Sequence, residues 1–526
     1  DQGPRESIET GLASCSGLSV LLIDACRAVG IPARFAGTPC WTNGSGNHSW
    51  VEVWADGWHF TGAAEPDGDA LDRGWFVGNA AAARADDPRH AIYATSFRRT
   101  SLSFPLSWNP QDRSISAVDV TPRYAGCGPG PAAGLSGASA AAVRPWSGLL
   151  AKDAASRPPW EELEWSEHPL DRETAKTAAR ELWADHAQRL RRERAAEVKA
   201  RILVIGEQKM PFFYTVSGQK PDAGRSLWIS LHGGGGAPPA VNTQQWENQK
   251  RLYAVPEGVY LAPRAPTDTW DLWHRNGIDA FFDRLIEDMI VFEDVDPDRV
   301  YLLGYSAGGD GVYQVAPRMA DRWAAAAMMA GHPNETSPLG LRNLPFALQV
   351  GADDGGYNRN AVAARWEKNL ADLHRQDPGG YEHWVRIREG KGHWMDREDA
   401  EALPWMAKFT REPWPERVVW KQDDVVRGQL YWLAADPAQL GQRAEIRASR
   451  DGQRIDVESA GARQVTILLR DDFIDLDRPV VITSRGRTVH EGVVPRTFRA
   501  LAESLGARGD PQLMFCGRVT VSLPAE

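Results

Sequence analysis

The spacing of apolar positions divides the 526-residue chain into four segments, of which the first runs to residue 126. Residues 15–29 carry apolar side chains at helical spacing, whereas residues 48–54 and 58–62 alternate between apolar and polar as strands do. The first segment is therefore predicted to be a compact α+β domain.

The second segment, residues 127–200, has a different composition. Residues 127–143 are rich in Gly, Ala and Pro, which is typical of a flexible linker. Residues 171–200 are strongly charged at helical spacing. We expect a linker and then a surface helix that connects two folded regions.

The third segment, residues 201–411, alternates strand-like with helical runs, which predicts a mostly parallel sheet flanked by helices. The expected strands are 226–231, 258–262, 299–304, 325–330, 345–351 and 383–388, and the expected helices are 244–253, 278–292, 308–323, 358–374 and 398–409. The fourth segment, residues 412–526, contains short alternating runs that predict a small β-rich domain, either a sandwich or a barrel.

Composition excludes several classes of protein. The net charge of −10 leaves no Lys/Arg surplus to neutralise phosphates, so we expect no nucleic-acid partner. Five cysteines are too few for a disulfide framework, and no Cys/His group has zinc spacing, so we expect neither a metal nor a cofactor. No apolar run reaches 18 residues, which predicts a soluble chain without a membrane span. Secreted or periplasmic localisation stays open, as does the oligomeric state.

A motif typical of a catalytic serine lies in the third segment. Gly304-Tyr305-Ser306-Ala307-Gly308 follows an aliphatic strand pattern and precedes a helical one. This G-x-S-x-G arrangement is typical of a nucleophile elbow, because a sharp strand-to-helix turn needs small residues around the serine. We predict that Ser306 is a nucleophile.

Three further features complete the prediction of a serine hydrolase. The glycines of His232–Gly236 follow a strand, so the amides of Gly233 and Gly234 are expected to form an oxyanion hole with that of Ala307. Asp354 follows the strand 345–351 and is the preferred acid, with Asp353 in reserve.

His393 stands in a Gly-rich loop after the strand 383–388 and is the expected general base. His374 and His383 fall on a helix and a strand, where structural roles are expected. The chain order serine, aspartate, histidine is that of an α/β-hydrolase. In this chemistry the histidine takes the serine proton, and the serine then attacks a carbonyl to form an acyl-enzyme.

The substrate-binding residues are expected on loops at the same sheet edge. Trp270, Trp273 and His274 follow the strand 258–262, and His332 follows the strand 325–330. They are candidates to shape a pocket for an acyl or aromatic group, although loop packing is an equal alternative.

Residues 201–410 resemble the α/β-hydrolase superfamily, nearest its polyhydroxybutyrate depolymerase and feruloyl esterase branch. The resemblance rests on the HGGGG turn, on Gly304-Tyr305-Ser306-Ala307-Gly308-Gly309 and on the Gly-His393 loop. It implies hydrolysis of a small or polymeric carboxylic ester and names no substrate. Peptidases of the prolyl oligopeptidase kind share the fold and the order of the triad.

A cysteine and a histidine form a second candidate site in the first segment. Cys15 begins an apolar helix, where the helix dipole and free amides favour a thiolate. His48 begins the strand 48–54. Each residue taken alone is more typical of packing than of catalysis, but the two occur in a specific context.

This context resembles the transglutaminase-like cysteine fold over about the first 125 residues. The shared residues are Cys15, Arg27, Gly30–Arg34, His48–Val53 and Gly57-Trp58. The family's third residue, an aspartate four positions after the tryptophan, is replaced by Gly62. We therefore expect Glu65, or else Asp67, to take its place beside His48. The lead-in before Cys15 is shorter than the family's.

The sequence thus favours a serine hydrolase that cleaves carboxylic esters and carries an accessory or second catalytic Cys/His domain. A serine or cysteine peptidase or amidase is the alternative within enzymes. A scaffold or binding protein is the alternative outside them, and the complete Ser306, Asp354 and His393 set argues against it.

Overall fold

The computed structural model describes residues 3–10, 13–44, 46–55, 57–63, 71–72, 74, 76–106, 109, 111–124, 145–150 and 152–524. Contacts between Cα atoms divide the chain into two compact units, Asp1–Ser147 and Gly148–Glu526. The linker predicted at 127–143 lies outside the described residues. Among the described helices, none combines the length and the apolar character needed to cross a membrane.

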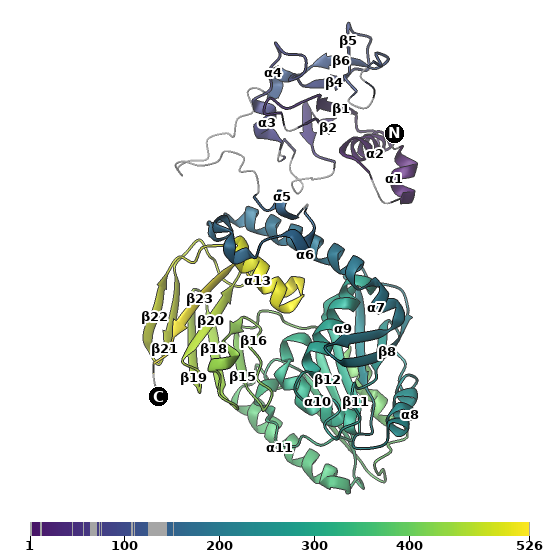
Figure 1. The fold of residues 1–526 in the computed structure, drawn as a ribbon, viewed down its shortest axis with the longest axis vertical. Coiled ribbons are helices and arrows are strands. Elements are labelled where there is room, and N and C mark those ends of the chain that lie inside the picture. The colour runs from purple at the N-terminus through teal and green to yellow at the C-terminus, as the bar shows by residue number, and fades with distance from the viewer. Residues whose placement is uncertain are drawn as a thin grey trace. The chain divides into compact units, whose positions relative to one another are not determined.

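The first unit contains one antiparallel sheet with a long helix packed on it (Figure 1). The strand order is β3 (Trp58–Thr61), β2 (His48–Trp54), β1 (Ala33–Thr38), β4 (Tyr93–Thr95), β6 (Ser116–Asp119) and β5 (Leu102–Ser103). The helices are α1 (Pro4–Thr10), α2 (Cys15–Ala28), α3 (Val77–Ala81) and α4 (Thr121–Tyr124). In β2, Val51 and Val53 join a core with Ile23 of α2. Trp50, whose side chain points to the other face, belongs to a second core that is rich in aromatic residues.

The second unit is built around an eight-stranded sheet. Its order is β14 (His383–Arg388), β13 (Phe346–Gly351), β12 (Ala325–Met329), β11 (Val295–Tyr305), β9 (Arg225–Leu231), β10 (Gly258–Pro263), β8 (Gln208–Ser217) and β7 (Ile202–Ile205). The six strands from β14 to β10 pair in parallel, and the β7–β8 hairpin adds an antiparallel edge.

Helices cover both faces of this sheet because its strands are apolar on both sides. In β12, Ala325, Ala327 and Met329 belong to a cluster that also contains residues of α12. On the other face, Phe346 of β13 contacts Tyr313 of α10 and Trp366 of α11. The flanking helices are α8 (Pro239–Gln249), α9 (Ile278–Glu293), α10 (Ala307–Arg318), α11 (Arg359–Gln376) and α12 (Ala402–Met406).

The charged helix of the second segment belongs to this unit. It is divided into α6 (Arg172–Glu193) and α7 (Ala195–Ala200), preceded by the short α5 (Ser147–Leu150). Ala175, Ala178, Leu182 and Leu190 are buried on one side of α6, which contacts α9 and α13. α6 therefore packs one apolar face against α9 and α13, whereas the sequence predicted an exposed connecting helix.

The last segment forms two sheets and a helix (Figure 1). The five-stranded sheet contains β15 (Arg417–Lys421), β18 (Glu445–Asp451), β19 (Arg454–Ala460), β21 (Val480–Ser484) and β22 (Arg487–Gly492). The four-stranded sheet contains β16 (Gln429–Leu430), β17 (Leu433–Ala434), β20 (Gln464–Leu469) and β23 (Gly517–Ser522), and α13 spans Phe498–Arg508.

Buried charges join this segment to the central sheet. Arg411 donates to Asp510 and to Asp298, each at 2.8 Å, and Arg508 pairs with Asp321 at 2.7 Å. All five residues except Asp298 are at most 5% exposed. We expected a separate C-terminal domain from residue 412, and the structure places this segment in one compact unit with the sheet.

Candidate active site

Ser306 stands at the turn between β11 and α10 in a strained backbone conformation. Its φ of 58° and ψ of −123° are unusual for a residue with a side chain. A Cβ on Gly304 would lie 2.3 Å from the carbonyl oxygen of Gly308, and one on Gly308 would lie 2.2 Å from that of Leu231. The glycines are thus required for α10 to approach β9 so closely.

The structure brings Ser306, His393 and Asp354 within hydrogen-bonding distance of one another in series. Nε2 of His393 is 3.0 Å from Oγ of Ser306, and Nδ1 is 2.8 Å from Oδ2 of Asp354. Asp354 is 3% exposed, and Nη1 of Arg359 lies 3.4 Å from its other oxygen. The neighbouring Asp353 is exposed, so the geometry selects Asp354 as the partner of the imidazole.

The loop that carries His393 is held by the residue before the nucleophile. The hydroxyl of Tyr305 donates to the backbone oxygen of His393 and accepts from the amide of Met395 at 3.2 Å. A Cβ on Gly351 would lie 2.1 Å from the backbone oxygen of Gly392. The loop therefore rests directly on the ends of β11 and β13.

The loop after β9 lies against Ser306. A Cβ on Gly233 would be 3.1 Å from Cβ of Ser306 and 3.6 Å from its Oγ. Ala307 occupies the first position of α10, where amides lack an acceptor inside the helix. The amides predicted as oxyanion donors therefore lie close to Ser306. Gly233 and Gly234 belong to the loop that contacts the serine, and Ala307 directly follows it.

The imidazole of His232 is neutral and holds the start of this loop through two hydrogen bonds. Burial lowers its pKa from its ordinary value to about 4. Nδ1 lies 2.7 Å from the backbone oxygen of Gly233, and Nε2 accepts from the amide of Ala265 at 3.0 Å. With Nε2 as the acceptor, Nδ1 carries the proton and donates to Gly233.

Three polar residues outside the motif hold the glycine loop, and sequence reasoning missed them. Oδ1 of Asn242 accepts from the amide of Gly235 at 2.9 Å, and its Nδ2 donates to Asp268 at 2.9 Å. Asp268 also pairs with Arg264. Asn242 precedes the helix predicted at 244–253, and no sequence signal marked it as a partner of the glycine loop.

The four residues predicted to bind substrate have different surroundings. Trp270 is 53% exposed at the edge of the site. Trp273 is fully buried and its indole donates to the backbone oxygen of His232 at 2.9 Å, so it supports the loop from within and offers no surface to a substrate. His274 and His332 are partly buried, and burial lowers the pKa of His274.

Asp310 is a further buried acid near the site that the sequence did not reveal. It is 6% exposed and accepts from the amide of His332 at 2.6 Å. Burial raises the pKa of this carboxyl from its ordinary value to about 6, against the opposing effect of the hydrogen bond. It positions the loop after β12.

In the first unit, the start of α2 lies beside the start of β2. Ser14 caps α2 by accepting from the amide of Gly17 at 3.2 Å, so Cys15 occupies the first turn. The hydroxyls of Ser16 and Ser49, the residues after Cys15 and His48, are 3.2 Å apart. Glu65 and Asp67 lie outside the described residues.

One group of carboxylates in the described part of the chain could hold a cation. Oxygens of Glu335, Asp423 and Asp424 lie within 4.8 Å of one another. Two of the three residues are exposed, and such acidic groups are common without an ion. No step of the chemistry below uses them.

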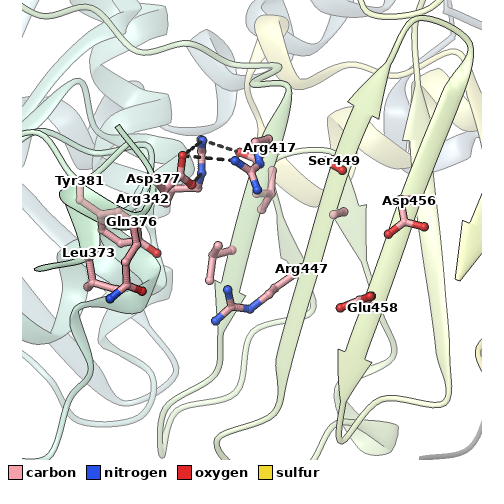
Figure 2. A pocket seen from close by; sticks show the side chains of 13 residues that line it. Arg342, Leu373, Gln376, Asp377, Tyr381, Arg417, Arg447, Ser449, Asp456 and Glu458 are labelled. Carbon is pink, nitrogen blue, oxygen red and sulfur yellow. Dashed lines mark hydrogen bonds and ion pairs between the residues drawn. The ribbon is translucent and has the colours of Figure 1, made fainter. Parts of the chain in front are cut away.

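A groove of about 360 Å³ lies between the α11 region and strands β15, β18 and β19 (Figure 2). Its lining holds three arginines (Arg342, Arg417, Arg447) and three acids (Asp377, Asp456, Glu458), so the charges balance in number, and Arg342 and Arg417 both donate to Asp377. Ser306, Asp354 and His393 are not among its lining residues. It is thus a hollow separate from the triad.

Comparison with protein families and with curated proteins gives two findings. The family model of the Transglutaminase-like superfamily matches residues 1–66, so the predicted resemblance of the N-terminal segment is confirmed. No curated protein matches the chain.

Esterases are among the solved structures to which parts of this chain are similar. A thermostable esterase is 19% identical with a TM-score of 0.33, and the match covers 40% of this chain and 62% of that one. A ferulic acid esterase is 18% identical with a TM-score of 0.30, over 39% and 96% of the chains. Esterase 2 of Thermogutta terrifontis is 17% identical with a TM-score of 0.29, over 40% and 91%. The function proposed below depends on side-chain geometry and not on these similarities.

Proposed function

We propose that the second unit is a serine hydrolase that cleaves carboxylic esters through an acyl-enzyme. The observation that carries the proposal is the hydrogen-bonded series from Ser306 through His393 to Asp354. A nucleophile, a base and a group that orients the base are the parts that acyl transfer requires.

The proposed reaction has two halves. Nε2 of His393 accepts the proton of Ser306 while Oγ attacks the ester carbonyl, and the amides of Ala307 and the Gly233–Gly234 loop stabilise the negative oxygen. The C–O bond to the alcohol then breaks, and His393 returns the proton to the departing alcohol. Water, deprotonated by the same imidazole, cleaves the acyl-enzyme and releases the acid and free Ser306.

Replacement of the nucleophile tests this proposal. Hydrolysis of 4-nitrophenyl butyrate by Ser306→Ala should fall by at least about 10³-fold, and labelling by a fluorophosphonate should disappear. The variant Cys15→Ala should retain both activities. Unchanged turnover in Ser306→Ala would exclude the mechanism, and a wild-type protein that neither turns over nor labels would favour a scaffold. Faster cleavage of a peptide anilide than of the ester would favour the amidase alternative.

We propose thiol chemistry at Cys15 as a second activity, favoured by the transglutaminase-like match over residues 1–66. Cys15 lies in the first turn of α2, and a helix N-terminus is a common position for a reactive cysteine. We assign His48 as its base and Glu65 as the residue that orients it. Iodoacetamide should alkylate Cys15 much faster than Cys26, whose pKa is raised by burial. Equal rates would remove this activity.

A further inference from the structure

Arg359 places a buried positive charge against the acid of the proposed triad. Its side chain is 9% exposed, and its Nη1 lies 3.4 Å from Oδ1 of Asp354, which is itself 3% exposed. The other carboxylate oxygen, Oδ2, is 2.8 Å from Nδ1 of His393. The carboxylate therefore lies between a guanidinium on one oxygen and the imidazole on the other.

The position of Arg359 in its helix is unfavourable for a cation. It is the first residue of α11, where the helix dipole favours negative side chains, and the N-cap residue, Asn358, provides no side-chain cap. In the part of the chain that the structure describes, Nε of Arg359 is buried without a hydrogen-bond partner, which costs free energy. Helix stability therefore does not account for this arginine, and such a breach of local rules is typical of a functional position.

The turn between β13 and α11 holds the guanidinium beside the carboxylate. The amide of Asn360 donates to the backbone oxygen of Asp354 at 3.2 Å, and its side chain donates to the end of β13 at 2.7 Å. Within the turn, Tyr357 has a left-handed backbone with φ of 55°, and its ring centre lies 4.8 Å from the guanidinium of Arg359. The arginine is thus fixed between its neighbours, and the backbone strain at Tyr357 accompanies this placement.

Other titratable or charged groups also surround the triad. They are Tyr305 on β11, Asp310 on α10, His332 after β12, Asp353 after β13, and Lys391 and Asp396 on the loop of His393. Asp310 accepts from the backbone of His332, and Lys391 pairs with Asp396 at 2.8 Å. Arg359 differs from all of these groups because its charge lies directly on the carboxylate that orients the imidazole.

We propose that Arg359 is a positioning residue of the hydrolase, which acts through Asp354 to keep the imidazole of His393 uncharged, and so able to accept the serine proton, down to a lower pH. The proposal rests on the serine hydrolysis proposed above. A buried carboxylate without the guanidinium would direct its full negative charge at the imidazole and stabilise the imidazolium. The guanidinium neutralises part of that charge and holds Oδ2 in line with Nδ1 of His393.

The test compares Arg359→Met and Arg359→Lys in the full chain. The control is Arg365→Met, which removes an exposed arginine from the same helix. Hydrolysis of 4-nitrophenyl butyrate would be followed from about pH 5 to 9, and the acid-side midpoint of the kcat/KM profile would be compared between variants. Circular dichroism would verify folding.

In Arg359→Met the acid-side midpoint should rise by about one pH unit, because the uncompensated carboxylate favours the protonated imidazole. On the plateau, kcat should fall about 3- to 10-fold with KM within about twofold, since the arginine contacts the acid and not the substrate. Arg359→Lys keeps the charge and should restore the midpoint, and Arg365→Met should match wild type. A midpoint in Arg359→Met equal to that of wild type would overturn the proposal.

Two further variants separate this effect from other causes. Burial raises the pKa of Asp310 to about 6, so this acid titrates in the same range, and the rise must persist when Arg359→Met is combined with Asp310→Asn. A rise that disappears in the double variant would overturn the proposal. If Arg359→Met does not fold, Arg359→Gln replaces it, because Gln keeps a hydrogen-bond donor without the charge. Loss of the fold in both variants would assign Arg359 a structural role and overturn the proposal as well.

A readout without turnover keeps this proposal distinct from the hydrolase itself. If wild type cleaves no ester, the proposed function fails by itself, and nuclear magnetic resonance then decides the role of Arg359. Histidine labelled with carbon-13 at Cε1 reports each imidazole, and the signal of His393 is the one that His393→Gln removes. Its titration midpoint should lie about one pH unit higher in Arg359→Met than in wild type. Equal midpoints in the two proteins would overturn the proposal.

Discussion

At the scale of single residues, Tyr305 links the proposed nucleophile, Ser306, to its proposed base, His393. It directly precedes Ser306, and its hydroxyl donates to the backbone of His393 and accepts from Met395. The motif G-x-S-x-G leaves this position undefined. In this chain the hydroxyl sets where the imidazole stands relative to the serine.

We expect Tyr305→Phe to lower kcat about tenfold with little change in KM, because the histidine loop loses its anchor while the substrate contacts remain. The matched control is Tyr301→Phe on the same strand, whose hydroxyl donates to Phe409 at 2.8 Å. Steady-state kinetics and thermal melts of both variants check the prediction. Similar kcat values in the two variants would contradict it.

Asp310 should make stability depend on pH. Its folded pKa of about 6 lies above the unfolded value, so the folded protein binds the proton more tightly. The free energy of unfolding should therefore fall by up to roughly 3 kcal/mol as pH rises from about 4 to 6, and level off above. Asp310→Asn keeps an acceptor for His332 and should remove this slope.

Urea unfolding at intervals between pH 4 and 8 measures that difference. The variant should gain stability relative to wild type above pH 6, because it no longer carries a buried charge. Parallel curves for the two proteins would show that another group carries the pH dependence.

At the scale of elements, the close approach of α10 to β9 determines the site. Gly308 is the point of contact, since a Cβ there would lie 2.2 Å from the backbone oxygen of Leu231. We expect Gly308→Ala to reduce the free energy of unfolding by roughly 1–3 kcal/mol and to reduce activity, because α10 must move away from the oxyanion loop.

The control is Gly506→Ala in α13, where an added Cβ meets nothing within 4 Å. A helical glycine in open space should gain up to about 1 kcal/mol from the change. Chemical denaturation and ester turnover of both variants provide the comparison. Equal effects would show that helix propensity, and not the contact with Leu231, dominates at residue 308.

Elements with a strong pattern could be predicted from the sequence. The strand predicted at 383–388 matches β14 in both bounds. The helix predicted at 278–292 begins with α9 and ends one residue before the end of α9. The helix expected at 244–253 is instead α8, Pro239–Gln249, because a proline at the first helical position begins it earlier. The hairpin of β7 and β8 and helix α13 were missed: β7 is a four-residue apolar run without alternation, and α13 lies in a segment where short strand-like runs predominate.

The same reasoning explains which parts of the site could be predicted. Ser306, Asp354 and His393 each follow a strand in a short, glycine-marked loop, and parallel strands bring such loops to one edge. The partners of Tyr305 and Asn242 depend on loop paths. A loop path is set by tertiary packing and leaves no periodic signal in the chain.

At the scale of the whole molecule, buried charges make residues 148–526 one unit. Arg322 and Asp321 of the α10–β12 connection pair with Asp510 and Arg508 of the C-terminal segment. These last residues belong to the tripeptide Arg508-Gly509-Asp510, whose two charged side chains are at most 4% exposed. The tripeptide therefore has a structural role in the junction.

We expect Arg411→Met to cost roughly 3–5 kcal/mol of unfolding free energy, because it leaves Asp510 buried without its closest cation. The control Lys220→Met breaks an exposed pair with Asp294 and should cost under about 1 kcal/mol. In urea, loss of ester hydrolysis and loss of the far-ultraviolet signal of the second unit should shift together in Arg411→Met. If hydrolysis survived while the β-rich segment unfolded, the segment would be an independent domain, and the charges across the junction would not couple it to the catalytic sheet.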